Sequence, residues 1–313
     1  MDDILITGSN KFEIDHVKSH LDKCFGIKDL GPLHYFLGIE VTYLPEGIVL
    51  SQKKFTHELL QVIDISYMKP VATPLPINCK LTAEDGAPTA DPTLYRIQMG
   101  KLNFLSNTRP DLSFAVQTLS QFMQNPKTTH MQALLHTLRY VKGTVGQGLL
   151  LKASDQLSLT AFSDSDWASC PSSRRSVTGY AIMLGSSLIS WKSKKQSTVS
   201  KSSSEAEYRA MSQAASEVTW LVRLLEELGV HSLKPVTLHC DNQSAIHIGR
   251  NPVFHERTKH IEIDCHFTRD KVLEGLLQLS YLPTADQLAD ILTKILPSSQ
   301  HKHLSTKLGM VLT

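Results

Sequence analysis

The sequence predicts an α/β (α+β) fold whose main part, residues 148–297, is a mixed sheet flanked by helices. From residue 148 on, short apolar runs with a period of two follow one another, and after residue 203 such runs alternate with helical patterns. This succession favours a mixed sheet with helices on its faces. With 313 residues and no apolar run near the ~20 residues of a membrane span, the chain has room for two soluble domains.

The first part of the chain, residues 1–67, predicts a short unit of strands and helices. It opens with MDDILITG, in which two acids precede an apolar, β-branched run, a pattern typical of a strand entered from a turn. Ser9 or Asn10 can cap the helix that follows. The stretch 34–51 predicts two strands joined by a Pro-Glu-Gly turn, and KKFTHELLQVI predicts a short amphipathic helix.

Residues 68–147 predict a linker followed by helices. The linker is rich in Pro, Ala, Thr and Asp and has little periodicity. Helical patterns cover about 93–106, 110–124 and 129–142. In the main part, strands are expected at GLLLKA, LSLTAFSDS, TGYAIMLGSS, SLISWKS, VTLHC and LLQLSYL, with a long helix at about 203–228 and a last helix from Asp286. Residues 298–313 are expected to form a C-terminal tail.

Composition indicates the setting of the protein. The five cysteines are scattered without a C-x-x-C pair, which favours reduced thiols in an intracellular protein over a zinc site or a disulfide framework. The opening residues lack the positive charge and the long apolar run of a signal peptide. The net charge of +2 says little about partners, although 14 histidines make the charge sensitive to mild acid.

Acidic residues at the ends of predicted elements are the candidates for chemistry. A period of two puts Asp164 and Asp166 on one face of a strand. The others lie at the start of the long helix, at a strand-to-helix junction and in the last helix: Glu205 and Glu207, Asp241, Asp286 and Asp290. Each also has a structural explanation, because acids are favoured in the first turn of a helix and Asp241 can serve as an N-cap.

The combination of these acids predicts a metal centre. Acids that converge at one edge of a mixed sheet repel one another unless cations lie between them. Carboxylate oxygens suit Mg²⁺ or Mn²⁺, and two such ions about 4 Å apart stabilise both oxygens of a phosphoryl displacement. The residue types therefore predict metal-assisted hydrolysis of a phosphodiester.

A lysine-rich strip lies between two of the acidic blocks. SWKSKKQSTVSK contains Lys192, Lys194, Lys195 and Lys201 among hydroxyl and amide side chains. Two interpretations stay open: a strip that binds nucleic-acid phosphates beside the site, or a solvated loop.

Several long blocks resemble the Pol polyproteins of copia-type retrotransposons. SDSDWASCPSSRRSVTGYAIMLGSSLISWKSKKQSTVSKSSSEAEYRAM, TLHCDNQSAI, KHIEIDCHFTRD and TADQLADILTK are similar to the ribonuclease H domain of that family. FGIKDLGPLHYFLGIEV with LSQKKF resembles the end of the reverse transcriptase palm and the start of its thumb, within 1–67. The blocks from LYRIQMG to LRYVKGT resemble the helical connection, within 68–147. The resemblance implies a ribonuclease H-like fold for 148–297.

The resemblance also interprets the N-terminus. MDD is similar to the motif at the tip of the polymerase palm hairpin, without its aromatic residue, so Asp2 and Asp3 would be remnant polymerase acids. The family's other metal-binding aspartate lies on an earlier palm strand, which this sequence does not contain. We therefore expect no DNA synthesis by this chain, and an unpaired edge on the hairpin within 34–51.

Matched to the family's motifs, the expected catalytic and metal-binding acids are Asp164, Glu207, Asp241 and Asp290. Asp166 remains the rival of Asp164, and Glu205 is the less favoured rival of Glu207. The sequence departs from cellular ribonucleases H in one respect, because the loop Leu-Pro-Thr before the last acid has no histidine. His260 and His266 are candidates by residue type only.

The resemblance implies an endonuclease that cuts the RNA strand of RNA–DNA hybrids with two Mg²⁺ ions, Mn²⁺ being the other option. It would recognise the hybrid by shape, 2′-hydroxyls and phosphates. Integrase-type recombinases use a related sheet with three acids, and the palm hairpin and the fourth acid speak against them. The alternative is an inactive relic or a nucleic-acid-binding remnant. The resemblance implies a cytoplasmic particle or the nucleus as location, without a membrane, and leaves the oligomeric state open.

Overall fold

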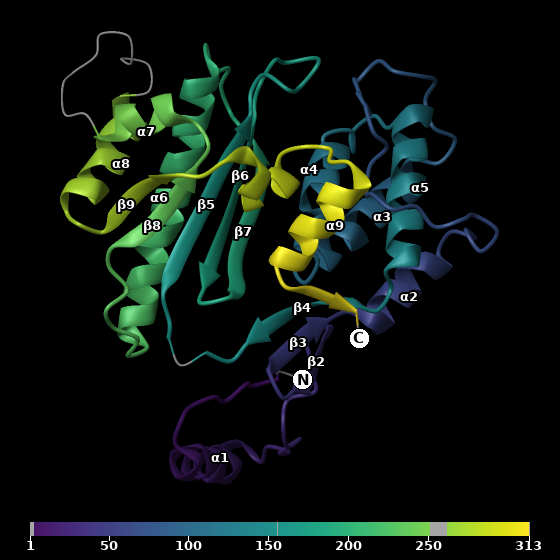
Figure 1. Ribbon diagram of the computed structural model, residues 1–313. Coiled ribbons are helices and arrows are strands. Elements are labelled where there is room, and N and C mark those ends of the chain that lie inside the picture. The colour runs from purple at the N-terminus through teal and green to yellow at the C-terminus, as the bar shows by residue number, and fades with distance from the viewer. Residues whose placement is uncertain (1–2, 155, 251–261, 313) are drawn as a thin grey trace.

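The structure is a computed structural model that describes residues 3–154, 156–250 and 262–312, and of 262–265 the main chain only. Figure 1 shows a sheet with helices on one side of the molecule, a group of helices on the other, and a strand ribbon below them. No described helix has the length and apolar character needed to cross a membrane.

The main sheet has the mixed architecture that the sequence predicts. Its strands lie in the order β7-β6-β5-β8-β9, with β6 antiparallel to its neighbours β5 and β7, and with β8 and β9 parallel to β5. The bounds are β5 Leu159–Asp166, β6 Val177–Leu184, β7 Ser187–Lys195, β8 Val236–Cys240 and β9 Leu277–Tyr281. The expected mixed sheet is therefore confirmed.

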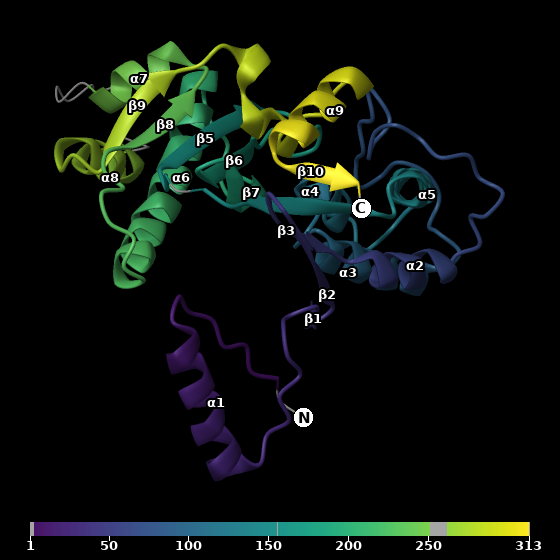
Figure 2. The same cartoon turned by 60° about the horizontal axis from the view of Figure 1, so that its bottom comes forward.

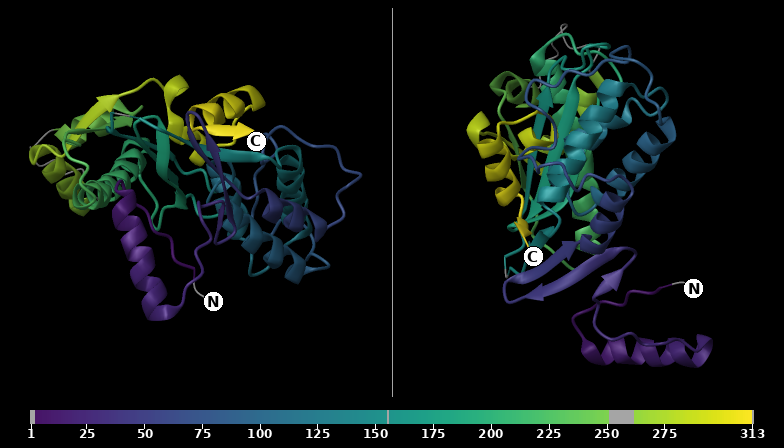
Figure 3. Two further views of the ribbon diagram at one scale, coloured as in Figure 1. Left: turned by 90° about the horizontal axis from the view of Figure 1, so that it is seen from below. Right: turned by 90° about the vertical axis from the view of Figure 1, so that its right-hand side faces the viewer.

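Helices cover both faces of this sheet (Figure 3). One face packs against the long helix α6 (Ser203–Glu227), followed by α7 (Gln243–Arg250) and α8 (Glu262–Leu273). The other face packs against the short 3₁₀ helix η4 (Leu288–Leu292) and against α9 (Ser298–Lys307). Both faces of the sheet are buried, because apolar side chains of the strands pack against apolar side chains of the helices on each face.

A separate helical core lies beside the sheet. It is formed by α2 (Lys53–Gln61), α3 (Pro92–Leu105), η1 (Pro110–Leu112), α4 (Ser113–Ser120) and α5 (Thr128–Gly143). Asp91 caps α3 by accepting a hydrogen bond from the Leu94 N–H at 2.8 Å, with a proline at the first helical turn. Residues 68–91 have no helix or strand, as the linker prediction requires.

A second sheet brings together segments that are far apart in the sequence. Its order is β1-β2-β3-β4-β10, with bounds β1 Tyr35–Phe36, β2 Ile39–Leu44, β3 Gly47–Ser51, β4 Gln147–Lys152 and β10 Met310–Leu312. The expectation of an unpaired hairpin edge is wrong for the β3 side, because β3 pairs antiparallel with β4 and β4 pairs with β10. On the β2 side the described partner is the two-residue strand β1, which pairs with Ile39 and Glu40 alone. The segment expected as a C-terminal tail supplies both α9 and β10.

Helix α1 (Lys11–Phe25) stands apart from the rest of the chain in Figure 2. Asn10 caps it by accepting from the Phe12 and Glu13 N–H groups, as the sequence predicts. None of its residues is buried. The apolar run that precedes the cap, expected as a strand, has no regular secondary structure.

A buried ion pair joins the helical core to the C-terminal segment. Arg109 donates to Asp111 at 2.8 and 2.9 Å and to the Thr144 carbonyl at 3.0 Å, and both charged side chains have no exposed surface. The Tyr140 hydroxyl donates to Asp111 at 2.7 Å, and its ring meets the imidazole of His301 on α9 edge to face. This network therefore holds α9, and through it η4, against η1 and α5.

Replacing Arg109 by Met should strongly destabilise the protein, because Asp111 would be left as a buried carboxylate without its cation. The expected loss is about 3–5 kcal/mol of the free energy of unfolding, measured by chemical denaturation. The matched control is Lys18→Met, which breaks the exposed Lys18–Asp29 pair and should change nothing measurable. Equal effects of the two substitutions would show that the buried pair contributes no more to stability than the exposed one.

Candidate functional site

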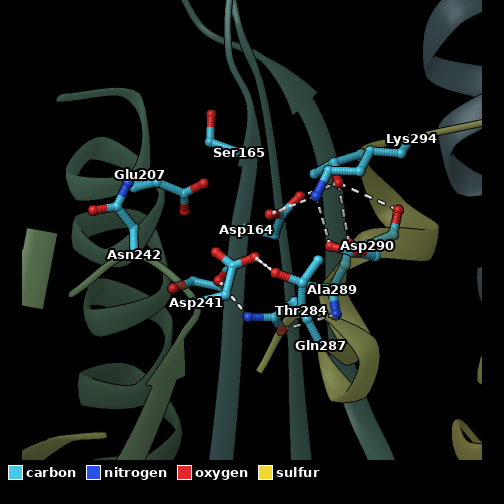
Figure 4. A network of polar contacts seen from close by, with 12 residues as sticks. Asp164, Ser165, Glu207, Asp241, Asn242, Thr284, Gln287, Ala289, Asp290 and Lys294 are labelled. Carbon is cyan, nitrogen blue, oxygen red and sulfur yellow. Dashed lines mark hydrogen bonds and ion pairs between the residues drawn. The ribbon is translucent and has the colours of Figure 1, made fainter. Parts of the chain in front are cut away.

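Four carboxylates meet where β5 and β8 end, at one edge of the main sheet (Figure 4). Carboxylate oxygens of Asp164, Asp241 and Asp290 lie within 4.8 Å of one another. Oxygens of Glu207 and Asp241 lie within the same distance of each other and of the Cys240 sulfur. The structure thus brings together the four acids that the sequence predicts.

Asp241 follows β8 directly but is not the cap of α7. The side chain of Asn242 accepts the Ala245 N–H at 3.0 Å and so performs the capping. Asp241 instead accepts the Thr284 hydroxyl at 2.8 Å. The capping explanation for Asp241 is therefore not supported, and its carboxylate faces the other acids.

The first turn of α6 separates the two glutamates. Glu205 accepts the Lys201 N–H at 2.8 Å and forms an ion pair with Arg209 at 3.0 Å, so its carboxylate stabilises the start of the helix. Glu207 lies two residues further along the helix, is buried, and points toward Asp241 in Figure 4. The geometry favours Glu207 as the member of the site.

Asp164 and Asp166 are likewise separated by their surroundings. Asp164 is 1% exposed and lies within the acidic group. Asp166 accepts a hydrogen bond from the Ser169 side chain, and burial raises its pKa. Within the described residues, the acids close enough to share one ion include Asp164 and not Asp166.

The last acid comes from a 3₁₀ helix, where the sequence predicted an α-helix. Asp286 ends η3 (Thr284–Asp286), is exposed and pairs with Lys307 at 3.1 Å, whereas Asp290 in η4 is buried. Between the two helices Gln287 is extended, donates to the Ser163 carbonyl of β5 at 3.0 Å and accepts the Ala289 N–H. This break fastens η4 to the strand and turns Asp286 away from Asp290.

Gly179 allows η4 to approach the sheet. It pairs with Asp164 across β5 and β6. A Cβ atom at this position would lie 2.6 Å from Thr293 Cγ2 and 2.9 Å from Leu292 Cβ. Only glycine therefore fits without a shift of the segment that carries Asp290.

The site is rich in negative charge that the protein itself does not fully neutralise. Burial, and next the charges of Asp164 and Asp241, raise the pKa of Glu207 well above its usual range. Burial, and next the charge of Asp164, raise the pKa of Asp290 from 3.8 to about 7. Burial also raises the pKa of Asp164, although Lys294 opposes this. Binding of cations would therefore stabilise the ionised forms of these carboxylates.

Lys294 is a member of the site that the sequence patterns did not single out. Its ammonium group lies 3.1 Å from Asp164 Oδ1 and 2.8 Å from Asp290 Oδ1. The preceding residue, Thr293, donates its hydroxyl to Asp164. The i, i+4 spacing of Asp290 and Lys294 was a usable signal, because such pairs meet on one side of a helical turn.

The residues present fit divalent cations of the hard type. All four carboxylates offer oxygen ligands, and an ammonium already binds two of them as a cation would. Glu207 and Asp241 would hold one ion, and Asp164 and Asp290 would hold a second, with Asp241 within 4.8 Å of both pairs.

The lysine strip divides into different environments. Lys195 donates to the Gln121 side chain at 2.8 Å and lies 2.9 Å from the Cys170 sulfur, where it helps to lower the thiol pKa to about 7 against the effect of burial. Lys192 lines a polar groove of about 470 Å³ between β7 and helices α3 and α4. Lys194 and Lys201 are exposed. Lys192, Lys194 and Lys201 are thus accessible to a nucleic acid, whereas Lys195 is held by protein contacts.

The remaining predicted residues lie outside the site or outside the described chain. Asp3 is exposed in a segment without regular structure, and Asp2 lies outside the described residues. His266 is exposed on α8, and His260 lies outside the described residues.

Comparisons with known proteins agree with the sequence blocks. A family model described as "Reverse transcriptase (RNA-dependent DNA polymerase)" matches residues 1–77. The retrovirus-related Pol polyprotein from transposon RE2 of Arabidopsis thaliana is 45% identical over 99% of this chain, which spans 21% of that relative. A putative transposon Ty5-1 protein of Saccharomyces cerevisiae is 32% identical, with 70% of this chain and 72% of the relative covered.

A solved structure of an N-terminal RNase H domain from Mycobacterium tuberculosis aligns with 48% of this chain and 97% of its own, at 13% identity and a TM-score of 0.32. A likeness at that distance supports no conclusion about this chain.

Without metal, the raised pKa of Asp290 should make the fold less stable as pH rises. A carboxyl whose folded pKa is raised contributes its full stability below its unfolded value of 3.8 and loses it as pH passes through about 7. In EDTA, Asp290→Asn should therefore gain melting temperature relative to the parent between pH 5 and pH 8. Buried histidines shift both proteins alike, so the difference isolates Asp290. Parallel pH curves would contradict this expectation.

Gly179→Ala should disturb the site through η4. The new methyl group must displace Thr293 and Leu292, so we expect weaker Mg²⁺ binding, measured by calorimetry, with an otherwise native circular dichroism spectrum. Gly100→Ala on α3 is the matched control, because a Cβ there meets nothing within 4 Å. Undiminished Mg²⁺ binding by the Gly179 variant would show that η4 can yield without moving Asp290.

Proposed function

Because the chain belongs to the family of copia-type retrotransposon Pol polyproteins, we propose that it cleaves the RNA strand of RNA–DNA hybrids in a metal-dependent reaction. The chain spans about a fifth of the length of the Pol polyproteins it matches, 21% for transposon RE2, so the proposal concerns the part that residues 148–297 supply. The observation that carries it is the meeting of Asp164, Glu207, Asp241 and Asp290 at one edge of the sheet.

Each acid has a defined role in this proposal. Asp164 and Asp241 would help Asp290 to hold an ion, since carboxylate oxygens of these three acids lie within 4.8 Å of one another, and Asp241 lies equally close to Glu207. Bound Mg²⁺ would supply a water of lowered pKa and neutralise the leaving 3′ oxygen. The Thr284 and Thr293 hydroxyls orient Asp241 and Asp164, and the Ser165 N–H orients Glu207. Their hydrogen bonds keep the ligand oxygens aimed at one place.

The surroundings of the site suit a polyanionic substrate recognised by its backbone. Lys194 and Lys201 are exposed on β7 and just before α6. Trp167, which follows β5, is 47% exposed while its indole N–H is held by the Ser200 carbonyl at 3.1 Å. An exposed aromatic ring in a fixed position can stack on a sugar or base, and Lys201, which follows the Ser200 that holds the indole, can contact phosphates.

Asp241→Asn tests the proposal. The substitution keeps the shape of the side chain but removes an anionic ligand, so Mg²⁺-dependent cleavage of a labelled RNA–DNA hybrid should fall by orders of magnitude. In EDTA the variant should be as stable as the parent or slightly more so, because one repulsive charge is gone.

The matched control is Asp286→Asn, which removes an exposed aspartate nearby in the fold, paired with Lys307, and should leave cleavage unchanged. Near-parental cleavage by Asp241→Asn would refute the four-carboxylate site. A parent protein that binds the hybrid and never cuts it would favour the alternative, a nucleic-acid-binding remnant.

A further inference from the structure

The acidic site has two sides that differ in their ion pairing. On one side, the Lys294 ammonium lies between Asp164 and Asp290, at 3.1 and 2.8 Å. On the other side, Glu207 and Asp241 form no ion pair with any Lys, Arg or His within residues 3–154, 156–250 and 262–312. Among the described residues, one half of the site is thus ion-paired with a lysine, and the other half is not.

Lys294 is held at this place by more than its pairing. Thr293 donates to Asp164 through its hydroxyl, and Gly179 leaves room for that contact. The two carboxylates that Lys294 binds come from β5 and η4, 126 positions apart in the sequence, and are 1% and 2% exposed. An isolated surface pair four residues apart would contribute little, whereas this ammonium joins two buried acids from different elements.

We propose that Lys294 is a built-in cation that controls access of the second divalent ion to the site. It keeps Asp164 and Asp290 together when no ion lies between them, and an ion that needs both must compete with the ammonium. The first ion, held by Glu207 and Asp241, which form no ion pair with Lys294, meets less competition. This inference rests on the proposed metal-dependent function and adds to it a difference in affinity between the two ions.

The Lys294 side chain can move away from Asp164 and Asp290 toward solvent. Lys294 is 29% exposed, while both of its partners are almost fully buried, so its flexible stem can move the ammonium toward solvent without moving η4. The site would therefore become fully loaded only at higher Mg²⁺ concentration or when substrate phosphate draws the second ion in.

Calorimetric titration of the full chain with MgCl₂ tests the proposal without relying on cleavage. The parent should show one tighter and one weaker ion. Lys294→Met should tighten the weaker ion by about tenfold or more, because a charge within ~5 Å of a divalent ion has an effect of that order even at the dielectric constant of water. The variant should also melt at a lower temperature in EDTA, since its acids have lost their cation.

Two further variants control for shape and folding. Lys294→Arg keeps the charge and should titrate like the parent, and Lys294→Gln removes the charge while keeping donors and should titrate like the Met variant. Lys307→Met breaks another lysine–aspartate pair in the same C-terminal segment, outside the site, and should leave both affinities unchanged. If the Met variant does not fold, the comparison of Arg with Gln decides.

The outcomes separate the inference from the function it rests on. Unchanged Mg²⁺ affinities in the Met and Gln variants, with a parent that binds Mg²⁺ and cuts hybrid, would overturn the role of Lys294 and leave the nuclease proposal standing. Weaker Mg²⁺ binding in these variants would also overturn it. A parent that binds no Mg²⁺ at all would refute the proposed function itself.

Discussion

The mutual repulsion of four carboxylates is the constraint on which the rest of this structure depends. Asp164, Glu207 and Asp290 are buried. A carboxylate oxygen of Asp241 lies within 4.8 Å of oxygens of Asp164 and Asp290, and likewise within 4.8 Å of an oxygen of Glu207. Burial and mutual charge both disfavour their ionised forms, as the raised pKa values of Glu207 and Asp290 show. The repulsion alone would move these carboxylates apart, so the rigid elements that carry them must hold them together.

Each acid is fixed by an element whose geometry has an independent cause. The pairing of β5 with β6 and β8 sets Asp164 and Asp241, because parallel neighbours end at the same edge of a sheet. The capped start of α6, with Glu205 paired to Arg209, sets the position of Glu207 one half-turn further on. Gln287 fastens η4 to β5. The favourable free energy of strand pairing, helix capping and the Gln287 hydrogen bond thus offsets the repulsion among the carboxylates.

Much of this could be read from the sequence, and the limits have physical reasons. The strand that carries Asp164 and the strand that ends before Asp241 follow from apolar periodicity, which a buried sheet imposes strongly. Whether Glu205 or Glu207 faces the site depends on where α6 begins relative to the sheet, which periodicity leaves uncertain by a residue or two. The 3₁₀ form of η4 arises from the bond of Gln287 to the Ser163 carbonyl, a contact between positions 124 apart that no local pattern reveals. The pairing of β3 with β4 and of β4 with β10 is non-local in the same way.

The C-terminal segment 284–312 carries a larger share of the site than its length suggests. It supplies the acid Asp290, the cation Lys294, the hydroxyl partners of Asp241 and Asp164, and the strand β10 that closes the second sheet. Through His301 the same segment packs on the buried Arg109–Asp111 pair of the helical core. The acidic site is therefore coupled to the helical core beside the sheet, because the residues that complete the site are held from both sides. A displacement of that core would reach Asp290 and Lys294 through α9 and η4, and so would act on the side of the site that already contains its own cation.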